Sequence, residues 1–128
     1  MIEWVYRAAQ QASATDVVVA TDDQRIIDVV EGFGGQACMT DSSHRSGTDR
    51  ILEVSRKLNW SKDSIVVNLQ GDEPLMPAVN ITQVAANLAS RECSMATLHQ
   101  AIDADEAQDP NLVKLVHDQH GHALYFSR

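Results

Sequence analysis

Short apolar segments alternate with amphipathic segments along this chain, and this alternation constrains its fold more than any other feature. Residues 16–20 (DVVVA) and 65–69 (IVVNL) form continuous, β-branched runs. Such runs are typical of strands buried on both faces, as in the parallel sheets of α/β proteins. The segments between them place apolar residues at helical spacing. The sequence therefore predicts an α/β fold, Rossmann-like, with a mostly parallel sheet flanked by helices.

The predicted elements follow one another without an internal repeat or a linker. Strands are predicted over residues 16–20, 36–39, 65–69, 95–99, 113–117 and 123–127, and helices over residues 2–10, 24–33, 49–58 and 77–88. The last two strands flank Gly121, which predicts a closing β-hairpin. We expect one domain over residues 1–128.

Three loops are expected at the carboxyl ends of strands, where open α/β sheets bind ligands. They cover residues 21–23, 40–50 and 70–77. Residues 21–23 (TDD) are typical of the cap of the next helix. The loop over residues 40–50 (TDSSHRSGTDR) leads into a helix. Its glycine allows close backbone approach, the helix N-terminus offers unpaired N–H groups, and Arg50 can grip a phosphate. The alternative is a polar surface loop in which Ser46 or Thr48 only caps the helix.

The loop over residues 70–74 (QGDEP) directly follows a predicted buried strand. A carboxylate at this edge, that of Asp72, is well placed to hold Mg²⁺ beside a nucleotide. The alternative is a turn in which Asp72 or Glu73 binds backbone N–H groups. Three histidines flank the final hairpin turn, and we expect them to be solvated rather than metal ligands.

The charge of the chain limits its partners. The formal net charge of -8 argues against a surface for binding nucleic acid. It does not argue against a nucleotide held by a local loop. No apolar run approaches the length of a membrane span, and the first ten residues have no signal-peptide pattern. We therefore expect a cytoplasmic protein that does not associate with membranes.

Several strings together resemble one family, the 3-deoxy-manno-octulosonate (Kdo) cytidylyltransferases. They are VVVATDD, CMTDSSHRSGTDR, VVNLQGDEPLMP, MATL and ALYFSR, and they occur in that family's order and spacing over essentially the whole chain. The combination of QGDEP with HRSGTDR is specific. Sialic-acid cytidylyltransferases resemble these strings less well.

The resemblance implies a nucleotide-diphospho-sugar-transferase-like fold and a nucleotidyltransferase with CTP and Kdo as substrates. A sugar hydroxyl would attack the α-phosphate of CTP to give CMP-Kdo for lipopolysaccharide biosynthesis and pyrophosphate, with Mg²⁺ as the cofactor. It also implies a homodimer. The implied catalytic residues are Asp72, also the metal ligand, and Arg50. The implied nucleotide contacts are Ser46, Gly47, Thr48, Arg50, Gln70 and Asp22, and the implied sugar contacts are Gln70 and Arg128.

The sequence departs from the family pattern in two respects. It lacks a motif like PARxxSxRLPGKPL, whose Arg and Lys hold the triphosphate, and a later region with a second metal-binding Asp. We therefore expect a fragment that alone is unstable, because open sheet edges are costly, and inactive. One alternative is that another chain supplies a strand. Another is a non-catalytic nucleotide-binding or interaction module on the same fold. A receiver-like signalling domain is the least favoured alternative.

Overall fold

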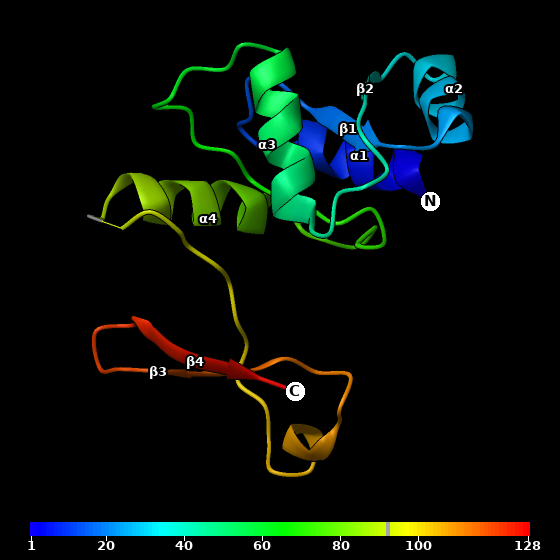
Figure 1. The fold of residues 1–128 in the computed structure, drawn as a ribbon. Coiled ribbons are helices and arrows are strands. Elements are labelled where there is room, and N and C mark those ends of the chain that lie inside the picture. The colour runs from blue at the N-terminus through cyan, green and yellow to red at the C-terminus, as the bar shows by residue number, and fades with distance from the viewer. Residues whose placement is uncertain (92) are drawn as a thin grey trace. The chain divides into compact units, whose positions relative to one another are not determined.

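The computed structural model describes residues 1–91 and 93–128, and their contacts divide the chain into two compact units (Figure 1). The first unit is Met1–Ala96 and the second is Thr97–Arg128. The prediction of one domain over residues 1–128 stays a prediction.

The first unit combines helices with a parallel strand pair. Its helices are α1 (Ile2–Gln10), α2 (Gln24–Gly32), α3 (Gly47–Lys57) and α4 (Ala78–Ala89), and its strands are β1 (Val18–Thr21) and β2 (Gln36–Met39). The two strands pair in parallel, with Val18 opposite Gln36 and Thr21 opposite Met39. Helix α2 connects them, so β1, α2 and β2 form a βαβ unit. This confirms the predicted α/β class.

Local side chains set the ends of α2. Asp23 precedes the helix, and its carboxylate accepts a hydrogen bond from the backbone N–H of Arg25 at 2.9 Å. The guanidinium of Arg25 binds the same carboxylate and lowers the pKa of Asp23 to about 2. Just beyond the C-terminus of α2, Gly34 has a φ of 79°, a conformation that costs glycine little. The predicted cap over residues 21–23 is confirmed.

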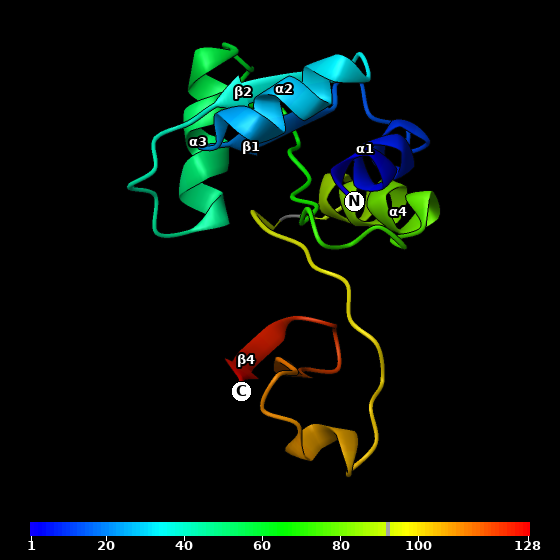
Figure 2. The same ribbon diagram turned by 90° about the vertical axis from the view of Figure 1, so that its right-hand side faces the viewer.

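The core of the first unit is small and draws on every helix. Its buried apolar side chains are Val5, Tyr6, Ala12, Ile27, Val30, Val54 and Ile81. The Tyr6 ring lies 5.4 Å from that of Phe33, and its hydroxyl accepts a hydrogen bond from the backbone N–H of Gln36 at 3.0 Å. Tyr6 therefore fixes α1 against the start of β2. Figure 2 shows α1 and α4 side by side, with α3 on the opposite side of β1.

Two predicted strands are wrong. Residues 65–69 and 95–99 form no strand. Neither segment has a hydrogen-bonded partner strand among the described residues, and β1 pairs only with β2. A β-branched run favours extended backbone, but a strand also needs a neighbour to bond with.

The start of α4 also differs from the expectation. Pro77 precedes α4 as its N-cap instead of being its first residue.

The second unit is built on the predicted hairpin. A short 3₁₀ helix, η1 (Glu106–Gln108), precedes β3 (Lys114–His117) and β4 (Ala123–Ser127), which pair antiparallel. Gly121 takes a φ of 83° in the connecting turn. The Asp118 carboxylate organises that turn by accepting the backbone N–H groups of His120 and His122, both at 2.8 Å. The described residues include no helix long and apolar enough to cross a membrane.

Candidate nucleotide site

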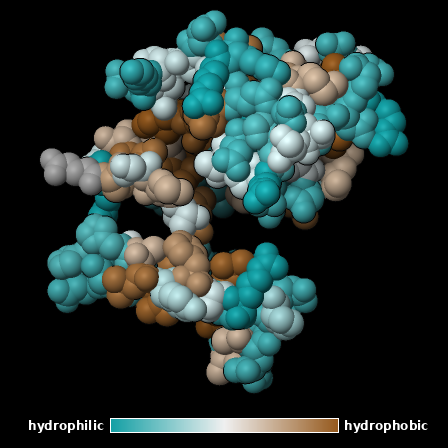
Figure 3. Space-filling model, in the orientation of Figure 1, coloured by the Kyte–Doolittle hydropathy of each residue, from teal (hydrophilic) through white to brown (hydrophobic). Residues whose placement is uncertain are grey.

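The first unit contains a cavity of about 880 Å³, lined by residues from α1, β1, α3 and α4 and by residues 64–72. Figure 3 shows hydrophobic residues gathered between α3 and α4. The lining residues that could contact a nucleotide, polar side chains and glycines, come from the start of α3 and from the segment that ends in the QGDEP loop. They are Gly47, Thr48, Arg50, Asn68, Gln70, Gly71 and Asp72. Two of the three loops predicted to bind ligands therefore meet at one cavity.

At the start of α3 the helix end is capped, and it lies close to the segment 64–72. The Ser46 hydroxyl accepts the backbone N–H of Asp49 at 3.1 Å and donates to the Asp49 carboxylate at 2.7 Å. A Cβ on Gly47 would lie 3.5 Å from the Nδ2 of Asn68, so the helix end lies against the segment 64–72. Ser46 does not line the cavity, whereas Gly47 and Thr48 do. Ser46 therefore caps the helix, as the alternative of a surface loop expected, but the capped N-terminus, which favours anions, also lies at the cavity.

Arg50 joins the predicted loops. Its side chain is 21% exposed, donates to the Thr40 hydroxyl and lies 3.3 Å from the carboxylate of Asp22. Asp22 and Thr40 are therefore partners that orient the guanidinium of Arg50, a residue that lines the cavity. An oriented, permanently charged guanidinium suits the recognition of phosphate. Asp22 does not line the cavity, and its predicted contact with a nucleotide stays a prediction.

The QGDEP loop presents an acid to the cavity. The backbone N–H of Glu73 donates to the carbonyl of Gln70 at 3.2 Å, which closes a turn. The Asp72 carboxylate makes no hydrogen bond or ion pair with any residue that the structure describes. The alternative in which Asp72 satisfies backbone N–H groups is therefore not seen, and its oxygens are available to a ligand. Gln70 and Asp72 are both exposed.

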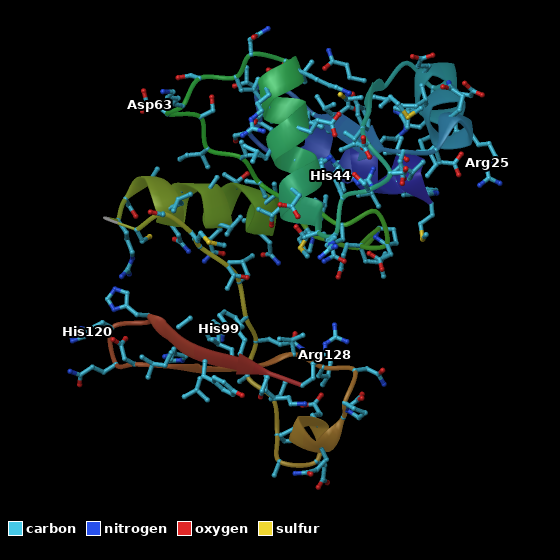
Figure 4. All side chains as sticks on the ribbon, in the orientation of Figure 1. Arg25, His44, Asp63, His99, His120 and Arg128 are labelled. Carbon is cyan, nitrogen blue, oxygen red and sulfur yellow. The ribbon has the colours of Figure 1, made fainter. Side chains whose placement is uncertain are left out.

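A cluster that the sequence did not single out holds the loop before α3. Glu53 accepts the backbone N–H of Asp41 at 2.9 Å, pairs with Lys57 at 2.6 Å and contacts the Nε2 of His44. Figure 4 shows His44 beside α3. Lys57, the Asp41 N–H and His44 together lower the pKa of Glu53 to about 2. We call these four residues the Glu53 clamp. The i,i+4 spacing of Glu53 and Lys57 was the available sequence signal.

Arg128 belongs to the second unit, where it follows β4 (Figure 4). Its predicted contact with a sugar therefore stays a prediction. The structure brings Gly47, Thr48, Arg50, Gln70 and Asp72 to one cavity and places Ser46 and Asp22 beside it as supporting residues.

Comparison with known proteins gives consistent results. A family model described as cytidylyltransferase matches residues 1–128. The 3-deoxy-manno-octulosonate cytidylyltransferase of Vibrio parahaemolyticus is 54% identical over 100% of this chain and 51% of its own length. That of Aliivibrio fischeri (strain MJ11) is 55% identical over 100% of this chain and 52% of its own length. The chain spans about half the length of the curated relatives it matches.

A solved structure is similar over nearly the whole chain. It is described as a CMP:2-keto-3-deoxy-manno-octonic acid synthetase complexed with CTP. The two share 41% sequence identity with a TM-score of 0.90, over 98% of this chain and 52% of the other. The predicted fold and the family resemblance are both confirmed.

Proposed function

This chain belongs to the cytidylyltransferase family, and from that premise we propose that it forms the CTP-binding part of an enzyme that joins CMP to 3-deoxy-manno-octulosonate. The observation that carries the proposal is the meeting of two loops at one cavity. One loop brings a helix N-terminus and Arg50, and the other brings Gln70 and Asp72. A triphosphate requires positive and N–H donor groups, and these residues supply them.

The reaction needs positioning more than covalent chemistry. A hydroxyl oxygen of the sugar attacks the α-phosphorus of CTP, the bond to the bridging oxygen breaks, and pyrophosphate leaves. Arg50 and the N–H groups at the start of α3 would hold phosphate oxygens and offset the charge that builds on them. Thr48 and Gln70 would contact the nucleotide from either side of the cavity, and Gln70 would also reach the sugar.

The donor set at the cavity fits Mg²⁺. Mg²⁺ is usually held through one or two carboxylates together with substrate phosphates. Asp72 offers a carboxylate without a partner among the described residues, and Gln70 offers an amide oxygen at the same edge. In the described residues no group of three or more His, Cys, Asp or Glu could hold a metal ion alone. We propose that Asp72 holds the ion together with the nucleotide, where it neutralises phosphate charge.

Calorimetric titration of the 128-residue chain with CTP in the presence of Mg²⁺ tests this proposal. CTP should bind with a Kd at least about tenfold lower than that of UTP or GTP. Arg50→Ala should raise the Kd about tenfold or more, because a charge-assisted contact to phosphate is lost. Asp72→Asn should remove the dependence of CTP binding on Mg²⁺ and leave the fold unchanged, since the side chains have the same shape.

Matched controls are available for both substitutions. Asp63→Asn removes an exposed acid on the loop before the segment 64–72, and Arg45→Ala removes an exposed arginine on the loop before α3 (Asp63 in Figure 4). Neither residue lines the cavity, so both variants should bind CTP as the parent does. Unchanged CTP binding in Asp72→Asn and Arg50→Ala would contradict the proposed site. The homodimer, the sugar contact of Arg128 and the inactivity of this chain alone stay predictions.

A further inference from the structure

Two histidines of the second unit lie together although they are far apart in the chain. His99 comes from the segment before η1, and His117 is the last residue of β3. Their ring centroids are 5.2 Å apart, and their ring planes are inclined by 42°. Figure 4 shows His99 beside the hairpin. Both residues are exposed, so a small solute can reach the two rings.

The backbone determines which nitrogen of His117 carries a hydrogen. Its Nδ1 lies 2.8 Å from the carbonyl oxygen of Asp118. A carbonyl oxygen only accepts hydrogen bonds, so Nδ1 carries the hydrogen and, in the neutral ring, Nε2 carries the lone pair. Histidines that bind metals have this arrangement, in which the second ring nitrogen donates to a carbonyl or carboxylate. The Nε2 of His117 makes no hydrogen bond with any described residue.

The ring of His99 is also available to a ligand. It makes no hydrogen bond or ion pair with any described residue, so either nitrogen can present its lone pair toward His117. The surrounding charge favours a cation, because residues 97–128 carry five acidic and two basic side chains. An exposed pair of imidazole lone pairs in an acidic unit suits a metal ion better than an anion.

The separation of the two rings matches that of two ligands on one tetrahedral ion. Zinc lies about 2.0–2.1 Å from an imidazole nitrogen, which places it about 3.2 Å from the centre of the ring. Two such rings at the tetrahedral angle have centres about 5.2 Å apart. The observed separation of the centroids is 5.2 Å. Aromatic rings in simple contact have similar separations, so titration with the metal decides between the two cases.

We propose that His99 and His117 form a site for a divalent transition-metal ion, and that Zn²⁺ is the ion that suits two imidazoles at this spacing. Water completes the coordination, because the described residues contain no group of three or more His, Cys, Asp or Glu able to hold a metal. The sequence favoured solvated histidines around the hairpin turn, but it did not place His99 next to His117. The bound ion links the segment before η1 to β3.

Titration of the 128-residue chain with zinc chloride tests this site. The titration is done without nucleotide and in excess Mg²⁺, which prefers oxygen ligands and should not compete. Calorimetry should give a single zinc ion per chain with a Kd of about 1–100 µM, since two ligands supply about half the binding free energy of a four-ligand site.

NMR of the imidazole nitrogens locates the bound ion. Zinc should shift the Nε2 resonance of His117 and one ring-nitrogen resonance of His99 at the same zinc concentration. The ring nitrogens of His44, His120 and His122 should keep their positions. Agreement between the calorimetric and NMR midpoints would show that both methods report the same site.

Substitutions separate chelation by the pair from binding elsewhere. His99→Gln and His117→Gln should each raise the Kd for zinc about tenfold or more, because a single imidazole cannot chelate the ion. His120→Gln is the matched control, since it changes an exposed histidine of the same hairpin that lies outside the pair. Cys93→Ser removes an exposed thiol, another ligand that zinc accepts. Both control variants should bind zinc as the parent does.

Three results would overturn the proposal. The first is that zinc does not bind below millimolar concentration, because the two rings would then form an aromatic contact only. The second is that His99→Gln binds zinc as tightly as the parent. The third is that the ring nitrogens of His120 and His122 shift instead of those of His99, which would place the ion at the hairpin turn.

Discussion

The two segments that meet at the cavity are held in opposite ways. The loop before α3 is tied down by the Glu53 clamp, by the Ser46 cap and by the contact of Arg50 with Thr40. The segment 65–69 makes no backbone hydrogen bond with any described residue. Yet the segment 65–69 has the more apolar sequence, and the loop has the more polar one.

The difference shows which interactions a short stretch of sequence can satisfy by itself. The partners that hold the loop are near in the chain: Glu53 bonds to residues 4 to 12 positions away. A strand has no such local partners, since its backbone must bond to a neighbouring strand. The polar side of the cavity is therefore organised by this chain, whereas the apolar side depends on what lies next to it.

Amide hydrogen exchange gives the largest expected contrast. Amides in the second half of α3 should exchange about tenfold or more slowly than those of residues 65–69, because the helical amides are hydrogen-bonded and those of residues 65–69 bond to no described residue. The measurement is exchange followed by NMR at pH 7 on the chain without ligand. Equal protection of both regions would show that the segment 65–69 has found a partner and would remove the contrast.

The same contrast explains what the sequence could and could not predict. Helix α3, the hairpin of β3 and β4, and the strands β1 and β2 follow from local spacing, and all were predicted, whereas the pairing of β1 with β2 was not. The strand predicted over residues 65–69 failed, because its β-branched run carries no information about whether a neighbour is present.

The residues of the candidate site also fall into two groups, those that the sequence predicted and those that it did not. The sequence predicted that the loops of Arg50 and Asp72 share a site, from the rule that ligands bind beyond the carboxyl ends of strands, and both residues line one cavity although residues 65–69 form no strand. The role of Asp22 as a partner of Arg50, and that of Glu53 in fixing the loop, depend on side-chain contacts that no single motif contains.

Removing the Ser46 cap of α3 should have the next largest effect, here on the stability of the fold. Ser46→Ala leaves the backbone N–H of Asp49 without its acceptor and should lower the free energy of unfolding by about 1 kcal/mol. Urea denaturation followed by circular dichroism measures this loss. Ser42→Ala is the matched control, because Ser42 lies exposed on the same loop and its hydroxyl makes no hydrogen bond with any described residue. A similar loss in both variants would assign the effect to the loop in general.

Disrupting the Glu53 clamp should have the smallest effect on stability, because ion pairs that are only partly buried are weakened by solvent and salt. Its effect has a distinct dependence on pH. The folded chain lowers the pKa of Glu53 from 4.5 to about 2, so the carboxylate is favoured in the native state. The resulting stability is complete above about pH 4.5 and is lost as the pH falls toward 2.

Comparing urea midpoints of the parent and of Glu53→Gln at several pH values isolates this contribution. The parent should be the more stable at pH 6, and the difference should shrink between pH 4.5 and pH 2. Glu31→Gln changes an exposed glutamate on α2 and should show no such trend. A difference that stays constant over this range would mean that Glu53 acts through shape alone. A difference that closes would mean that its charge holds the loop, and with it the start of α3, against the cavity.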